Sequence, residues 1–274
     1  MRRMQLITAL CLFLLFVPIY LWKVQGITFW SHGNSPVAPT PRYDAKKDAP
    51  HDDIVEMLRE SLIKYEDSGV QGYTCTIAMH ERVKGKLKPP EVLDCWFLEK
   101  PFSVLVHWRE GADRVAASLY VEGSNDGKMC VRPANPAAKR VFGTVNSAVD
   151  SGDARGSTRY MITEFGIRCG TERTYKAWKS LKDRGVKLNI EYLGKRHVDE
   201  VGGRECHVVK RYCDPPEEEG LTEITLYIDA ETKMQVGSIL KAGDELIGEY
   251  FFKDIVINPT FNPDLFKAET LKKY

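Results

Sequence analysis

The fold is decided by residues 221–258, which read LTEITLYIDAETKMQVGSILKAGDELIGEYFFKDIVIN. In the first third of this stretch Ile224, Leu226 and Ile228 alternate with polar or amphipathic residues. Side chains of a strand point to opposite faces of a sheet in turn, so this period of two is typical of a strand with one buried face. The stretch therefore begins with a strand that presents an apolar face to a core.

Two turns divide the rest of this stretch. Residues 229–233 and 242–245 are rich in Asp, Glu, Gly and Thr, whereas residues 234–241 and 246–258 are rich in β-branched and aromatic side chains. Runs of that composition between such turns are typical of consecutive hairpins. Residues 221–258 are thus predicted to form an antiparallel meander of three strands.

Another strand pair is predicted immediately upstream. Residues 187–198 and 204–212 are joined across Gly202 and Gly203, which can adopt the positive φ that tight hairpin turns require. Five consecutive strands are therefore expected to close the chain.

The first half of the chain is also predicted to be mostly sheet. Strands are expected at residues 73–83, 92–98, 102–109, 116–121, 129–132 and 140–144, whereas residues 144–170 are the least regular part. We expect Asp52 to cap a first helix, and Thr171 to cap a second helix that holds Trp178. Helices among antiparallel strands indicate an α+β domain.

The N-terminal residues indicate export. Arg2 and Arg3 precede a long uncharged apolar run, so residues 1–26 are predicted to be either a cleaved signal peptide or an uncleaved signal anchor. Residues 27–51 hold four prolines and are predicted to form a tether, which leaves residues 52–274 as the folded domain. The domain should lie outside the cytoplasm, in the periplasm or anchored to the inner membrane.

Charge and cysteine content exclude several classes of partner and site. The 39 basic and 38 acidic side chains leave no basic excess for phosphates, so a nucleic-acid partner is not expected. Outside the apolar N-terminal run there are six cysteines, and none forms a Cys-x-x-Cys pattern. They permit disulfides in an exported protein but also fit buried thiols. If residues 84–85 form a tight turn, Cys75 and Cys95 should be bonded or in contact.

The catalytic patterns in the sequence are incomplete. His80-Glu81 begins a zinc-binding His-Glu-x-x-His pattern, but Lys84 stands where the second histidine is required. Cys206 and His207 are neighbours on a predicted strand, so they should point to opposite faces and cannot form a nucleophile–base pair. We therefore predict no catalytic residue, no metal and no cofactor.

The C-terminal residues resemble a known superfamily. The features are a strand ending in Tyr-Ile-Asp at residues 227–229, Met-Gln-Val at 234–236, EYFFKDIVIN at 249–258 and Asp-Leu-Phe at 264–266. Together they look like the C-terminal half of the LolA/LolB lipoprotein carriers, and more closely like a family of exported bacterial proteins that is related to those carriers but has no assigned function.

The resemblance implies an antiparallel, strongly curved, unclosed β-barrel with helices covering its concave face. It also implies that the chain holds an acyl chain, a lipoprotein or another apolar ligand in the half-barrel. Lys100-Pro101 is similar to an Arg-Pro step of the carriers, with Lys100 in place of their functionally important arginine.

Apolar faces of several strands and one helix supply the candidate ligand-binding residues. The candidates are Val104, Val106, Trp108, Trp178, Leu226, Ile228, Val236, Leu240 and Phe252, with Lys100 added from the resemblance. Such faces also occur wherever strands pack an ordinary core, and that interpretation stays open.

The leading hypothesis is a non-enzymatic protein of the cell envelope whose partner is an apolar ligand or a lipidated protein, with the membrane as a further partner if the N-terminal segment is uncleaved. A sensor or scaffold that binds an envelope protein on the same fold is the alternative. Its expected signs are a filled concave face and an exposed apolar patch. An enzyme is the least favoured reading.

Overall fold

The computed structural model describes residues 53–274 of the chain. These described residues all belong to one compact unit. The predicted signal segment, the predicted tether and the proposed cap Asp52 lie outside the described residues. No helix of the described part is long and apolar enough to span a membrane.

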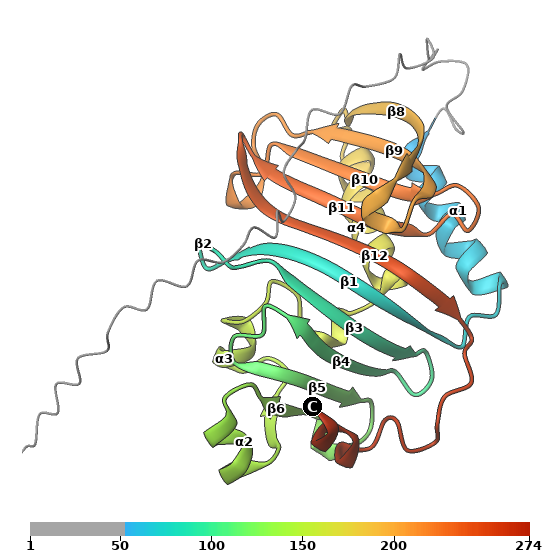
Figure 1. Cartoon of the computed structure of the whole chain (residues 1–274). Helices are drawn as coiled ribbons and strands as arrows, with labels where there is room; N and C mark the ends of the chain where they lie inside the picture. The colour runs from blue at the N-terminus through green and yellow to red at the C-terminus, as the bar shows by residue number, and fades with distance from the viewer. Residues whose placement is uncertain (1–52) are drawn as a thin grey trace, which may run out of the picture. The chain divides into compact units, whose positions relative to one another are not determined.

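One antiparallel sheet of twelve strands forms the centre of the structure (Figure 1). The strand order is β7-β6-β5-β4-β3-β1-β12-β11-β10-β9-β8, and the short β2 pairs with β1. Strands β7 and β8 are the two edges and do not pair with each other, so the sheet does not close into a barrel. The predicted unclosed antiparallel sheet is therefore confirmed.

The strands and helices have the following bounds. The strands are β1 (Gly72–Val83), β2 (Lys86–Leu87), β3 (Glu91–Leu98), β4 (Ser103–Glu110), β5 (Val115–Val121), β6 (Lys128–Pro133), β7 (Val145–Ala148), β8 (Asn189–Val198), β9 (Arg204–Tyr212), β10 (Glu223–Asp229), β11 (Gln235–Ala242) and β12 (Glu245–Ile257). The helices are α1 (Ile54–Asp67), α2 (Pro136–Phe142), α3 (Gly152–Arg155) and α4 (Ile167–Asp183), with short 3₁₀ turns that include η3 (Asp199–Val201) and η5 (Ala268–Lys273).

The five C-terminal strands, β8 to β12, follow the predicted order and pair in sequence. The strand predicted at residues 140–144 is wrong, because these residues continue α2 and end it at Gly143. The Asn135 side chain caps α2 by accepting the Ala137 and Ala138 amides, and Pro136 occupies the first helical position. The asparagine cap and the proline favour a helix here more strongly than Val141 and Thr144 favour a strand.

Both predicted helix caps need correction. Asp53, and not Asp52, caps α1 through the amide of Val55. Helix α4 begins at Ile167 after Gly166, so Thr171 lies one turn inside it. Gly166 is required here for two reasons. Its φ of +114° is strained for any residue with a side chain, and an added Cβ would clash with the Tyr73 hydroxyl at 2.9 Å.

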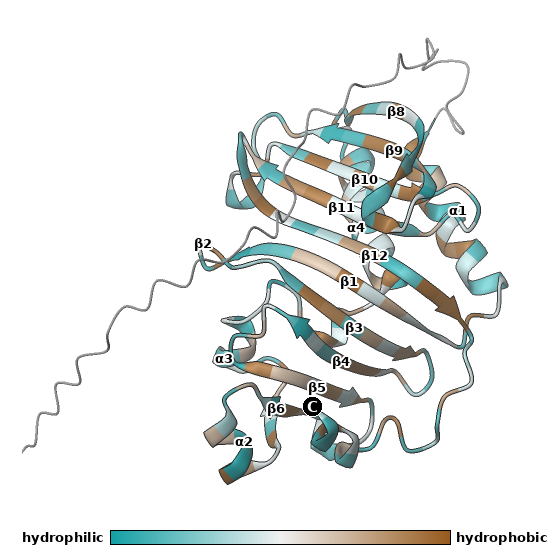
Figure 2. Ribbon diagram, viewed as in Figure 1, coloured by the Kyte–Doolittle hydropathy of each residue, from teal (hydrophilic) through white to brown (hydrophobic). Residues whose placement is uncertain are grey.

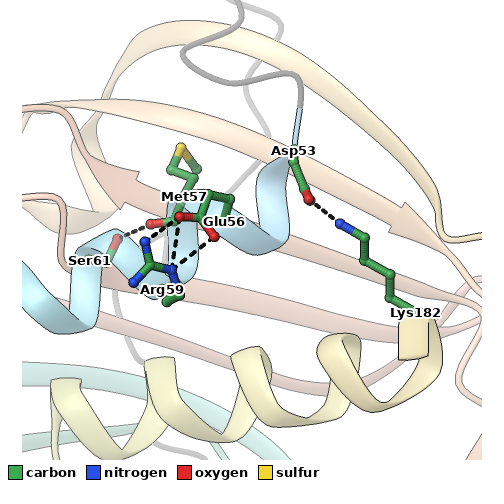
Figure 3. Close-up of polar contacts among 6 residues, drawn as sticks. All are labelled: Asp53, Glu56, Met57, Arg59, Ser61 and Lys182. Carbon is green, nitrogen blue, oxygen red and sulfur yellow. Dashed lines mark hydrogen bonds and ion pairs between the residues drawn. The ribbon is translucent and has the colours of Figure 1, made fainter. Parts of the chain in front are cut away.

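Helices α1 and α4 pack against each other and cover one face of the sheet, which we call the inner face (Figure 1). The α4 side chain of Trp178 is 1% exposed and lies in one cluster with Leu58 of α1 and Leu226 and Ile228 of β10. An ion pair between Asp53, at the N-terminal end of α1, and Lys182, at the C-terminal end of α4, joins the two helices and lowers the pKa of the Asp53 carboxyl (Figure 3). The predicted helical cover is thus present.

The opposite, outer face of β3 to β6 is covered by the C-terminal segment. The fully buried Leu271 of η5 packs with Leu105, Ala117 and Leu119. Apolar side chains occupy both faces of this part of the sheet, so β4 and β5 contain runs of apolar residues (Figure 2). The last residues therefore belong to the folded unit.

We predict that Leu271→Ala destabilises the chain by about 2–5 kcal/mol, because it removes a side chain from a closed apolar cluster. Denaturant unfolding of residues 43–274 measures the change. The neighbouring exposed Lys272→Ala is the control and should leave the free energy of unfolding nearly unchanged. Equal stability of Leu271→Ala and the parent would show that the C-terminal segment does not seal this face.

Candidate functional site

The predicted ligand-binding residues are distributed over two buried clusters on the inner face. The first cluster holds Val104, Val106 and Val236, with Trp108 and Phe252 packed against it at partial exposure. The second holds Trp178, Leu226 and Ile228. Leu240 is half-buried and pairs with Ile224 of β10 at the margin of the second cluster. Lys100 stands exposed in the turn between β3 and β4.

Side chains of the helices fill the inner face over β8 to β10. Six of the predicted residues, Val104, Val106, Trp178, Leu226, Ile228 and Val236, are at most 5% exposed. In this conformation they pack the core against α1 and α4. Their role in binding a ligand stays a prediction, and a ligand would have to displace part of what covers them.

A second, irregular segment covers the inner face over β1, β3, β4 and β12. We call residues 149–166, which include α3, the cover segment. Its Phe165 lies 6.1 Å from Phe97 of β3 between ring centroids, and its Tyr160 lies 5.7 Å from Tyr250 of β12. The cover segment therefore joins the edge strand β7 to α4 by crossing the middle of the sheet.

A buried polar cluster lies on the inner face beside the cover segment. It comprises Glu81, Lys88, Glu91, Trp108 and Tyr250. The carboxylates of Glu81 and Glu91 belong to residues that are only 2% and 3% exposed. Glu81 Oε2 accepts a hydrogen bond of 2.8 Å from the Tyr250 hydroxyl. Glu91 accepts one of 2.5 Å from Lys88 Nζ and one of 3.1 Å from Trp108 Nε1.

Polar contacts fasten the cover segment to this end of the sheet. Lys88 Nζ donates to the Ser157 carbonyl at 2.8 Å. Arg159 donates to the Arg82 carbonyl at 3.3 Å and forms an ion pair of 2.5 Å with Glu219. Between Tyr160 and Phe165 the attachment becomes apolar.

The fastening leaves buried polar atoms without partners. In the described part of the chain, Glu81 Oε1, Arg82 Nε and Arg159 Nε are buried and accept or donate no hydrogen bond. Burial raises the pKa of the Glu81 carboxyl, against the opposing effect of the Tyr250 hydroxyl. Unpartnered buried polar atoms cost free energy, so this junction stabilises the fold less than a fully hydrogen-bonded one would.

Another polar group lies at the end of β9. His207 contacts the Tyr192 hydroxyl at 2.7 Å through Nδ1 and Lys233 Nζ at 3.0 Å through Nε2. Burial and the Lys233 charge lower the pKa of His207 to about 4, so the imidazole is neutral and accepts from the ammonium. The group ties β9 to β8 and to the turn before β11. In the described chain no set of His, Cys, Asp and Glu side chains could hold a metal.

A shallow hollow of about 190 Å³ lies on the outer face, away from the predicted apolar wall. Its lining is Leu193, Arg196, Lys210, Glu223, Thr225, Tyr227, Ile239 and Lys241. Four of these eight side chains are charged, so the hollow does not suit an apolar ligand.

The predicted approach of Cys75 and Cys95 is confirmed as a contact and not as a disulfide. The two residues are direct partners across β1 and β3, and both are free thiols buried in the inner-face core. Burial raises the pKa of the Cys95 thiol well above its usual range. Every described cysteine is free.

The sequence contained a sign of the polar cluster that the motif search did not use. In β1 the residues Tyr73, Cys75, Ile77 and Met79 share one face, and the same alternation places Glu81 on it. Glu91 continues the buried face of β3 in the same way. Carboxylates in register with an apolar face predict buried acidic groups, a signal that is separate from the incomplete zinc pattern at His80-Glu81.

A family match covers most of the described domain. The sequence profile of a protein family of unknown function, DUF1571, matches residues 70–272. The chain belongs to the DUF1571 family. The match confirms the prediction of a family without an assigned function. No curated protein matches this DUF1571 chain in sequence.

Several solved structures are similar to the DUF1571 chain. One is the Mycobacterium tuberculosis lipoprotein LppX, with 13% identity, a TM-score of 0.41, and coverage of 76% of this chain and 97% of that one. The LolA superfamily protein NE2245 from Nitrosomonas europaea has 8% identity, a TM-score of 0.36, and coverage of 78% and 98%. A putative outer membrane lipoprotein-sorting protein domain from Vibrio parahaemolyticus has 14% identity, a TM-score of 0.36, and coverage of 84% and 100%. These similarities do not identify a ligand.

We predict that Glu81→Gln stabilises the chain more at pH 7 than at pH 4. The folded state raises the pKa of Glu81, so it favours the protonated acid, and this contribution is lost as the pH rises from the unfolded-state pKa through the folded-state pKa. Glutamine keeps an acceptor for Tyr250 and does not titrate. Denaturant unfolding of parent and variant at the two pH values measures the difference.

The exposed Glu110→Gln is the control for this experiment and should shift stability equally at both pH values. A Glu81→Gln variant whose stability relative to the parent does not depend on pH would contradict the buried, protonation-favouring environment.

Proposed function

We propose that this DUF1571 protein is a non-enzymatic protein of the cell envelope that binds an acyl chain, or another apolar ligand such as a lipidated protein, on its inner face beneath the cover segment. The observation that carries the proposal is the junction at Glu81 and Arg159, where a cover over an apolar sheet face leaves buried polar atoms unpartnered. The superfamily resemblance of the sequence supports the same class of ligand.

The physical argument compares the cover segment with α1 and α4. The two helices bury Trp178 and Leu58 completely or nearly so, and detaching them would expose a large apolar area. The cover segment is held by two hydrogen bonds and one ion pair, together with Ile162 and Phe165, which are only partly buried against the core. Water can replace the polar contacts at little net cost. Displacement is therefore easiest at the cover segment.

A ligand could replace the apolar contacts of the cover segment with its own. Each methylene group buried against Val104, Val106 and Phe252 would contribute about 0.8 kcal/mol. Several methylenes would be needed to offset the entropy of association. Arg159 Nε and the Glu81 carboxyl would provide polar partners for the ligand's polar end.

The non-enzymatic part of the proposal is supported by how the polar cluster is engaged. Lys88 and Trp108 bind Glu91, and Tyr250 binds Glu81. Location outside the cytoplasm follows from the apolar N-terminal residues and forms part of the same proposal.

A protein-binding scaffold on the same fold is the second candidate. Two observations favour it: helix and cover side chains fill the inner face, and Val141 and Phe142 are 72% and 65% exposed. A filled inner face and an exposed apolar patch were the signs expected of a scaffold.

We predict that Leu240→Asn weakens the binding of a fluorescent fatty acid to residues 43–274 about tenfold or more, because it places a polar amide on the apolar wall. Ile239→Asn is a matched control. The two residues are adjacent on β11 and both half-buried, but Ile239 lines the hollow on the outer face. Fluorescence titration gives the dissociation constants, and solvent extraction of the purified parent tests for bound lipid.

The two candidates make different predictions here. Saturable binding by the parent that Leu240→Asn weakens and Ile239→Asn does not supports the carrier. A folded parent with no lipid in its extract and no saturable binding would leave the scaffold as the better account.

A further inference from the structure

An exposed apolar group lies where the sheet ends at β7, beside α2. Val141, Phe142 and Val145 lie within five residues of one another, and they are 72%, 65% and 42% exposed. Lys139 and Arg140 precede them directly. We call these five residues the edge patch. Figure 2 shows apolar (brown) and hydrophilic (teal) residues together on α2 at this end of the sheet.

The segment that carries the edge patch contains basic side chains and no acidic ones. Residues 128–149 include Lys128, Arg132, Lys139 and Arg140 and no acidic residue, so their formal charge is 4 − 0 = +4, compared with +1 for the full chain. Within residues 53–274, Lys128, Lys139 and Arg140 form no ion pair. Their positive charge is thus available to an external partner.

The edge patch belongs to a hydrogen-bonded part of the structure, so its exposure does not result from local unfolding. Asn135 caps α2, and Arg132 donates to the carbonyls of Lys139 at 3.4 Å and Gly143 at 2.6 Å. Arg132 Nε also donates to the C-terminal Tyr274 carbonyl at 3.2 Å. These bonds anchor the backbone on both sides of Phe142, whose side chain extends into solvent.

We propose that the edge patch docks the domain on an anionic phospholipid surface. Aromatic and apolar side chains partition into the boundary between headgroups and acyl chains, and unpaired lysine and arginine beside them attract anionic headgroups. Charge complementarity therefore favours a lipid surface.

This docking is independent of a ligand on the inner face. The edge patch lies on α2 and β7, whereas the predicted apolar wall lies on β4, β10, β11, β12 and α4. A domain held against a membrane through this patch would be positioned to exchange an apolar ligand with it.

The experiment is co-sedimentation of residues 43–274 with vesicles. Parent protein should bind vesicles of phosphatidylcholine mixed with phosphatidylglycerol, bind phosphatidylcholine vesicles much less, and lose part of its binding in high salt. Val141→Ser with Phe142→Ser, and separately Lys139→Gln with Arg140→Gln, should each reduce the partition coefficient about tenfold.

Matched controls remove similar residues elsewhere. Val186→Ser with Val256→Ser changes side chains that are 45% and 54% exposed, and Lys86→Gln with Lys187→Gln removes two exposed charges. Neither control should change the partition coefficient. Thermal unfolding and fatty-acid titration of the patch variants should match the parent, which separates a failure of docking from a failure of ligand binding.

Three results would overturn the docking proposal. These are no binding of the parent to anionic vesicles, equal binding to both kinds of vesicle, and equal losses in the patch and control variants. Capture of an acidic protein by the patch without vesicle binding would replace the lipid surface with a protein partner.

Discussion

The antiparallel pairing of β1 with β12 is the interaction on which the rest of the structure depends. It joins the first long strand to the last in the middle of the sheet, with Ile77 opposite Phe252 and Met79 opposite Tyr250. Asn258 completes the junction by accepting the Gln71 amide at 2.7 Å and donating to the Gly69 carbonyl at 3.1 Å. Because the halves of the chain meet here, the inner face is one continuous surface.

A central pairing of this kind limits where the molecule can open. Separating the halves of the sheet would break a ladder of backbone hydrogen bonds together with the cores on both faces. Detaching α4 would expose Trp178, which has an aromatic side chain and is 1% exposed. The cover segment is attached through Lys88, Arg159 and a few rings, so under the proposal it is the part that a ligand would displace while the sheet stays intact.

Local patterns in the sequence predicted most strands, because alternation and turn composition are properties of neighbouring residues. The meander from β10 to β12 and the hairpin at Gly202-Gly203 are of this kind, and both are confirmed. The pairing of β1 with β12 depends on contacts between residues about 180 positions apart, and no pattern in the sequence indicated it. Helix α2 was missed because its cap, Asn135, lies in a loop-like stretch.

The candidate site was predictable only where it depends on the alternation of neighbouring residues. Alternation correctly placed Leu226 and Ile228 on one face, but it could not show that Trp178 would fill the space above them. The groups that act on Glu81 come from separate regions of the chain: Tyr250 on β12 donates a hydrogen bond to it, and the charge of Lys88, which follows β2, lies nearby. Such a cluster follows from the tertiary fold, although the position of Glu81 on an apolar face indicated that something unusual was buried there.

Hydrogen–deuterium exchange with and without a saturating fatty acid tests the central claim most directly, that an apolar ligand binds on the inner face beneath the cover segment. The account predicts that the ligand changes the exchange rates of residues 149–166 while the paired amides of β1 and β12 keep their protection. A ligand that binds saturably but leaves residues 149–166 unchanged, or that alters only the outer face around Tyr227 and Ile239, would contradict it.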